Sequence, residues 1–166
     1  PGLPDVVREF SEARFVSISD NQRRRLPGAK WLATNHHGLP PSLFRPSSEH
    51  RTYLAFLGRL TAEKGPEDAI RIAEAVGMPL RIAAKIPRAE TAYFKKQLQP
   101  HIDGKRVTLV GEVDDEKKQP FLAGAAALLF PIDWPEPFGL VMIEAMACGT
   151  PVIAYRSGSV PEVIDH

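Results

Sequence analysis

Cysteine is almost absent from the sequence: Cys148 stands alone, so no disulfide can form within the chain. A single cysteine fits a reducing compartment such as the cytoplasm. No apolar run approaches the roughly 18 residues of a membrane-spanning helix, and the first residues do not resemble a signal peptide. These absences predict a cytoplasmic protein without a transmembrane segment. A peripheral association of the full-length protein with a membrane stays open.

An excess of charge of one sign is also missing, because 21 basic residues face 20 acidic ones and the net charge is +1. Proteins that bind nucleic acid carry a basic patch or stripe, so we expect no nucleic acid among the partners. No strand is followed by the pattern G-x-G-x-x-G, and the phosphate-binding pattern that ends in Gly-Lys-Ser/Thr is absent. A conventional dinucleotide or P-loop site is therefore not supported.

Two pairs of residues suggest a metal site, and both have a simpler explanation. His36 and His37 are adjacent, so they point in opposite directions on an extended chain, and no third ligand is near in sequence. Asp114 and Asp115 are able to hold Mg²⁺, but a helix cap with an acid in the first turn accounts for them more simply. We predict no metal site and no cofactor.

The sequence does contain a regular alternation of apolar segments from residue 52 onward. Strands are predicted over 53–57, 80–84, 106–110, 126–130 and 151–155, and helices over 66–76, 89–98, 114–123, 140–148 and 160–165. Apolar strands that alternate with helices indicate a parallel sheet covered on both faces. With right-handed crossovers, this gives an α/β fold with a Rossmann-like, doubly wound sheet.

The chain divides near residue 50 into a lead-in segment, 1–50, and a Rossmann-like domain, 51–166. The lead-in segment is predicted to contain short strands over 14–19 and 31–34, and a helix capped by Asp20. In doubly wound sheets, ligands bind in the loops that follow the carboxyl ends of the strands. A ligand site is therefore expected in those loops of the second part of the chain.

The loop after the first strand of the domain carries two cations between two glycines, from Gly58 to Gly65. Arg59 supplies a planar fork of donors and Lys64 a point charge, and both suit a diphosphate. The alternative is that both are surface charges that pair with neighbouring acids, Glu63 or Glu67.

The segment from Pro131 to Gly149 places a carboxylate, Glu144, in a helix that is apolar on every other face. Burying this carboxylate without a partner would cost several kcal/mol, so it must meet a donor: a core arginine or the hydroxyls of a ligand. Glu136 lies in the preceding loop and is able to point into the same cleft. Trp134 is either a wall of that cleft or part of the loop packing.

Three motifs resemble, in their residues and in their order along the chain, those of the retaining GT-B glycosyltransferases called group 1 or family four. Residues 136–154 resemble the family's signature, with Glu136 and Glu144 separated by seven residues. Residues 58–65 resemble its phosphate loop. Residues 157–163 resemble its glycine-proline-glutamate turn, although Ser157 replaces a common glycine.

The resemblance implies a role for each matching residue. Arg59 and Lys64, with Gly58, would hold the diphosphate of a nucleotide-sugar donor and stabilise the leaving group. Glu136 would contact the donor sugar, and Glu144 the ribose hydroxyls. The backbone amides of Phe138, Gly139 and Leu140 would bind the sugar or a phosphate, and Val113 would lie near the nucleobase.

The resemblance also implies partners that lie outside the chain. Such enzymes have a second, N-terminal Rossmann-like domain and react in the cleft between the two, so the lead-in segment would lie on the interdomain side. The domain over 51–166 would then be truncated at its C-terminal end, and the fragment alone would be inactive. We expect a hexosyltransferase that acts with retention on an unidentified acceptor. The alternative is a non-catalytic or epimerase-like module that binds a phosphorylated sugar or nucleotide.

Overall fold

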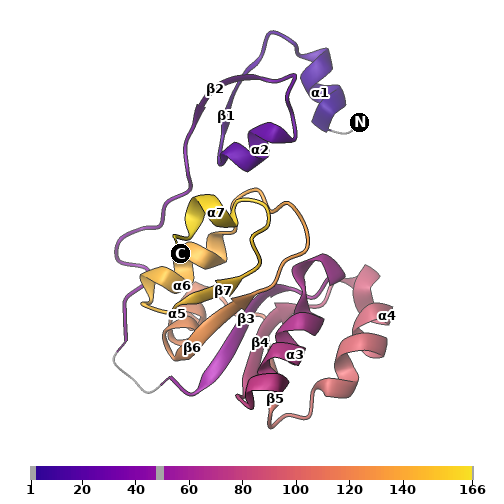
Figure 1. Cartoon of the computed structure of the whole chain (residues 1–166), viewed down its shortest axis with the longest axis vertical. Helices are drawn as coiled ribbons and strands as arrows, with labels where there is room; N and C mark the ends of the chain where they lie inside the picture. The colour runs from indigo at the N-terminus through magenta and orange to yellow at the C-terminus, as the bar shows by residue number, and fades with distance from the viewer. Residues whose placement is uncertain (1–2, 48–50, 166) are drawn as a thin grey trace.

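The computed structural model describes residues 3–47 and 51–165 (Figure 1). Residues 48–50 of the predicted connection, with residues 1, 2 and 166, lie outside these ranges. The main body is a sheet of five parallel strands in the order β5-β4-β3-β6-β7. The strands are β3 (Tyr53–Arg59), β4 (Leu80–Lys85), β5 (Val107–Gly111), β6 (Ala125–Phe130) and β7 (Val152–Ala154). Each predicted strand of this sheet is present, and no strand end is shifted by more than two residues.

The strand order confirms the doubly wound architecture. The chain starts at the central strand β3, adds β4 and β5 on one side, and then returns to add β6 and β7 on the other side. All pairings are parallel. The order therefore reverses between β3 and β6, and such a reversal opens a crevice at the carboxyl ends of the two strands.

Helices cover both faces of the sheet, because its strands are apolar on both sides. Leu54 and Phe56 pack into a core cluster with α3 (Pro66–Val76). Tyr53 and Ala55, which alternate with them, pack into a second cluster with α5 (Asp115–Ala123) and α6 (Leu140–Ala147). Figure 1 shows α3 beside β3 and β4, with α5 and α6 near β6. The helix predicted over 66–76 has those bounds.

One predicted helix is less regular than expected. In place of a continuous α-helix over 89–98, the chain forms a 3₁₀ turn (Arg88–Glu90), the single turn α4 (Thr91–Tyr93), a π turn (Phe94–Leu98) and a second 3₁₀ turn (Gln99–His101). Pro100 gives the physical reason, since it has no N–H for the carbonyl four residues earlier and its ring crowds that carbonyl. Leu98 is nevertheless fully buried in the core.

The lead-in segment forms a small unit outside the main sheet. It contains α1 (Leu3–Glu9), β1 (Arg14–Ser17), α2 (Asp20–Arg24) and β2 (Lys30–Thr34), with β1 and β2 paired in parallel. The predicted cap of α2 is wrong by one residue. The Ser19 hydroxyl accepts from the Gln22 amide at 2.9 Å, whereas the Asp20 carboxylate accepts from the Thr34 hydroxyl at 2.7 Å.

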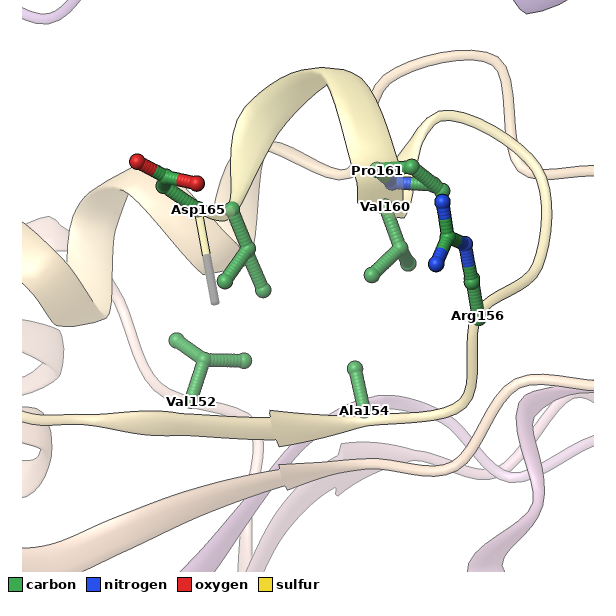
Figure 2. A pocket seen from close by; sticks show the side chains of 7 residues that line it. Val152, Ala154, Arg156, Val160, Pro161 and Asp165 are labelled. Carbon is green, nitrogen blue, oxygen red and sulfur yellow. The ribbon is translucent and has the colours of Figure 1, made fainter.

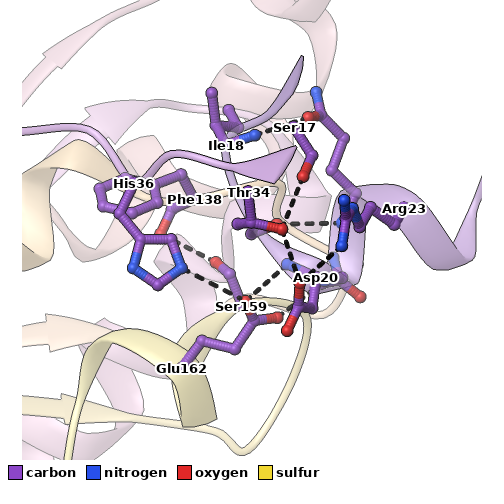
Figure 3. A network of polar contacts seen from close by, with 12 residues as sticks. Ser17, Ile18, Asp20, Arg23, Thr34, His36, Phe138, Ser159 and Glu162 are labelled. Carbon is purple, nitrogen blue, oxygen red and sulfur yellow. Dashed lines mark hydrogen bonds and ion pairs between the residues drawn. The ribbon is translucent and has the colours of Figure 1, made fainter. Parts of the chain in front are cut away.

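A carboxylate of the main domain anchors this unit. Glu162, in α7 (Val160–Val163), accepts hydrogen bonds from the backbone amides of Asp20 and Asn21, both at 2.7 Å (Figure 3). The Asn21 side chain donates to the carbonyl of Glu136 at 3.0 Å. A negative charge at the start of a helix is favourable, because the first amides have no partner within the helix. The two units are thus joined by polar contacts between segments distant in sequence.

Glu162→Gln is expected to loosen this anchor. The glutamine side chain keeps an oxygen that accepts hydrogen bonds but loses the negative charge. Hydrogen exchange at the backbone amides of Asp20 and Asn21 should therefore accelerate about tenfold, equivalent to about 1.4 kcal/mol. Exchange measured by NMR would report this, with Glu9→Gln, an exposed change in α1, as the control. Unchanged protection at both amides would contradict the anchoring role.

Candidate functional site

A cavity of about 350 Å³ opens where β3 and β6 end, at the reversal of strand order. Ligands of doubly wound sheets bind at this place. The predicted residues that line it are Gly58, Arg59, Lys64, Glu136, Gly139, Leu140 and Glu144, and the other lining residues are Phe56, Leu57, Lys118, Phe130 and Val141. The fold therefore gathers most of the predicted site in one place.

Two loops form the charged part of the cavity, and they pack against each other. The first follows β3 and bends back through a 3₁₀ turn, Ala62–Lys64. The second runs from Pro131 to Gly139. The amide of Asp133 donates to the carbonyl of Glu63 at 3.0 Å, and Gly65 lies directly against the Pro131 carbonyl. Backbone contacts therefore fix the spacing between the cationic loop and the loop that carries Glu136.

Glu136 is held by two donors. Its Oε2 accepts from the Lys64 ammonium and from Trp134 Nε1, the latter at 2.8 Å. The side chains of Lys64 and Glu136 are only 15% and 13% exposed, and the Lys64 ammonium lies 4.8 Å from the centre of the Trp134 ring. The alternative that Lys64 pairs with Glu63 or Glu67 is thus wrong. Trp134 is not among the residues that line the cavity, and its contact with Glu136 is part of the loop packing.

Glu144 meets a lysine that the sequence analysis missed. Lys118 Nζ donates to Glu144 Oε1 at 2.9 Å, and the two side chains are 18% and 10% exposed. The alternative of a core arginine is therefore wrong, while contact with ligand hydroxyls stays a prediction. The sequence did contain a signal that Lys118 faces the protein interior. Helical spacing places Lys118 one turn before Phe121 and Leu122, which are both buried.

The surroundings of Lys118 favour its charged form. Burial alone lowers the pKa of the ammonium, but the hydrogen bonds that it donates to Glu144 and Asp115 outweigh burial, and the pKa is raised. Lys118 is therefore a cation across the neutral pH range. Together with Arg59 and Lys64, it gives the cavity three cations against two carboxylates. One positive charge in excess suits an anionic ligand.

The amino end of α6 adds to this preference. Gly139 and Leu140, at its start, line the cavity. The first amides of a helix have no partner within the helix and attract anions. Phe138 and Val113 do not line the cavity: Phe138 is buried with its ring against His36 and His37, and Val113 packs on the second core cluster. A backbone contact at Phe138 and a nucleobase near Val113 stay predictions.

A second hollow, of about 410 Å³, lies between β7 and α7 (Figure 2). Its lining residues are Val152, Ala154, Arg156, Val160, Pro161, Ile164 and Asp165. The aliphatic side chains face each other across it, and the two charged residues stand toward its ends. Since specific sites need several converging polar groups, the cavity at β3 and β6 is the better candidate.

Other site classes receive no support within the parts of the chain that the structure describes. Among residues 3–47 and 51–165, no three His, Cys, Asp or Glu side chains are grouped so that they could hold a metal ion. Asp114 caps α5 by accepting from the Lys117 amide at 2.9 Å, as predicted. Cys148 is buried, and burial raises the pKa of its thiol. No helix over the same residues is long and apolar enough to cross a membrane.

Proteins of known sequence and of known structure resemble this chain. The D-inositol 3-phosphate glycosyltransferase of Pseudarthrobacter chlorophenolicus is 27% identical over 147 residues, which cover 84% of this chain and 33% of the relative. AviGT4, a glycosyltransferase involved in avilamycin A biosynthesis, matches with a TM-score of 0.77 and 28% identity over 89% of this chain and 46% of that one.

A third match extends the fold comparison to nearly the whole chain. Anabaena Alr3699/HepE, solved with UDP and glucose, gives a TM-score of 0.82 at 21% identity and covers 98% of this chain and 49% of that one. At this identity the likeness shows the fold alone. The solved proteins have the GT-B fold, so the expected half of a GT-B fold is confirmed.

This chain spans about a third of the length of the curated relative and about half of each solved protein. Residues 44–166 match the family model described as "Glycosyl transferases group 1". Since this match includes well over half of the sequence and contains the whole cavity, the chain belongs to the group 1 glycosyl transferases.

Proposed function

We propose that this chain is the donor-binding half of an enzyme that transfers a sugar from a nucleotide-diphosphate sugar to an acceptor, with retention. The observation that carries this proposal is the convergence of Arg59, Lys64, Glu136 and Glu144 on one cavity at the strand reversal. The cavity presents both cations and carboxylates. Cations suit a diphosphate, and carboxylates suit the hydroxyl groups of a sugar and a ribose.

Arg59 and Lys64 would bind the diphosphate. Preorganised cations lower the barrier most where negative charge develops, which in sugar transfer is the leaving phosphate. Arg59 ends β3 and is exposed, whereas Lys64 is nearly buried. Lys64 therefore has the larger potential effect, because a charge interaction strengthens as water is excluded.

Each carboxylate keeps one oxygen for the ligand. Within the described ranges, Lys64 and Trp134 both donate to Oε2 of Glu136, which leaves Oε1 for the hydroxyls of the donor sugar. Lys118 donates to Oε1 of Glu144, which leaves Oε2 for the ribose hydroxyls. A carboxylate has about four acceptor positions on its two oxygens. The internal ion pairs are thus compatible with a bound donor.

Titration calorimetry with UDP-, GDP- and ADP-sugars tests the proposal. UDP-glucose belongs in the panel because the Anabaena protein of the same fold was solved with UDP and glucose. Binding of at least one sugar nucleotide is expected, and no binding at millimolar concentration would overturn the proposal. In the longer protein, binding without transfer to any acceptor would favour the non-catalytic or epimerase-like alternative.

Glu144→Gln is expected to weaken binding of the preferred nucleotide about tenfold, because a neutral amide accepts a weaker hydrogen bond from the ribose. The matched control is Glu116→Gln, a change at an exposed acid in the first turn of α5. Calorimetry on both variants gives the comparison. Equal affinities of the two variants would remove Glu144 from the site.

A further inference from the structure

Lys118 occupies an unusual place for a lysine. It lies on α5, lines the cavity, and has an 18% exposed side chain. Its neighbour Lys117 shows the ordinary alternative, since its side chain is 72% exposed and pairs with Asp114 at 3.4 Å. A buried ammonium is costly unless it is paired and hydrogen-bonded. The partners of Lys118 therefore offset the cost of its burial.

The hydrogen bonds of Lys118 show what it holds. Its ammonium donates to Glu144 Oε1 at 2.9 Å and to Asp115 Oδ1 at 3.1 Å. Asp115 is 67% exposed, so water is able to replace that contact. Glu144 is 10% exposed, and among residues 3–47 and 51–165 its carboxylate accepts from Lys118 alone. Of the two carboxylates, Glu144 therefore depends more strongly on the hydrogen bond from Lys118.

We propose that Lys118 is a positioning residue for the nucleotide ribose. It binds one oxygen of Glu144 and so fixes the orientation in which the other oxygen meets the ribose hydroxyls. This role rests on the proposed function. It requires no contact between Lys118 and the ligand.

The position of Lys118 allows two other roles, and each predicts a different response to its removal. As a phosphate ligand, Lys118 would contribute to the binding of any diphosphate, with or without a ribose. As a competitor, it would have to leave Glu144 before the ribose could bind, and its removal would strengthen binding. The ligand used in the measurement separates these roles from positioning.

Three probes are compared by calorimetry on wild type, Lys118→Met and Lys117→Met. They are the nucleoside diphosphate that wild type binds best, its 2′,3′-dideoxy analogue, and inorganic pyrophosphate. Lys118→Met is expected to weaken the first about tenfold, the loss that follows from a disordered charged acceptor. The dideoxy analogue and pyrophosphate should bind Lys118→Met and wild type with equal affinity. Lys117→Met should match wild type with all three.

Rescue and coupling separate positioning from a general loss of structure. Lys118→Arg keeps a cation near Glu144 and should recover most of the lost affinity. Lys118→Met combined with Glu144→Gln should bind the nucleotide as Glu144→Gln alone does, because Lys118 acts only through Glu144. This double variant buries no unpaired charge, so it tests the role even where Lys118→Met alone unfolds.

The outcomes are distinct. Equal losses for the nucleotide and pyrophosphate would assign Lys118 to the phosphates, and tighter nucleotide binding by Lys118→Met would make it a competitor. Additive losses in the double variant would also overturn positioning. If wild type binds a nucleotide and the affinities of Lys118→Met and Lys117→Met are equal, the positioning role of Lys118 is refuted while the proposed function stands. If wild type binds none of the nucleotides, the proposed function fails first.

Discussion

Lys64→Met is expected to weaken binding of the nucleotide-diphosphate sugar about 100-fold, or about 2.7 kcal/mol. The side chain keeps its length but loses the charge that would meet the diphosphate. The same substitution removes the ammonium from Glu136, which then keeps only the Trp134 N–H as a donor in the described structure. Calorimetry with the preferred donor measures the loss, and thermal unfolding shows whether the fold is retained.

Lys85→Met is the matched control for this prediction. Lys85 is the register partner of Arg59 on the neighbouring strand, so it stands at the same edge of the sheet. Its side chain is 64% exposed and lies 3.7 Å from Glu112. If binding depended only on the total positive charge at this edge of the sheet, removing either lysine would weaken it equally. A loss in Lys85→Met as large as that in Lys64→Met would therefore remove Lys64 from the site.

Gly65→Ala is expected to lower the free energy of unfolding by about 3 kcal/mol and the melting temperature by about 10 °C. Gly65 precedes α3 with φ 69°, in the left-handed region that disfavours other residues. A Cβ there would lie 1.9 Å from the Pro131 carbonyl oxygen. The two loops would have to separate, so donor affinity should fall with stability. Thermal unfolding measures the first effect and calorimetry the second.

Gly77 offers a control at the other end of the same helix. It also has φ 69°, but nothing lies within 4 Å of a Cβ placed on it. Gly77→Ala should therefore show the backbone cost alone, about 1 kcal/mol, with donor affinity unchanged. The difference between the two variants isolates the contact with Pro131. Equal destabilisation would mean that this contact contributes nothing.

The fold was predictable because its main signals are local. Each strand of the main sheet is a short apolar run, and the helix over 66–76 has its proline start and glycine end written into the sequence. The two incorrect predictions of local structure also have local causes. Pro100 disturbs the helix before it, and Ser19 competes with Asp20 for the cap because its hydroxyl reaches the Gln22 amide.

The site was predictable only in part, because its ion pairs join elements that are distant in sequence. The positions of Arg59, Lys64, Glu136 and Glu144 follow from strand ends and motifs. Their partners do not, since Lys64 and Glu136 are 72 residues apart, and Lys118 and Glu144 are 26 apart. No periodicity encodes which cation meets which carboxylate. The packing of the two loops brings Lys64 to Glu136, and the packing of α5 against α6 brings Lys118 to Glu144.

The backbone of Glu136 links the cavity to the lead-in segment. Its carbonyl accepts from Asn21 Nδ2 and from the Ser159 amide, each at 3.0 Å, while its carboxylate faces the cavity beside Lys64. A ligand that shifts Glu136 therefore changes the free energy of the contacts with α2. By thermodynamic reciprocity, a shift of α2 changes the ligand's affinity by the same factor. In that case the lead-in segment contributes to ligand affinity, although all the residues that line the cavity come from the other part of the chain.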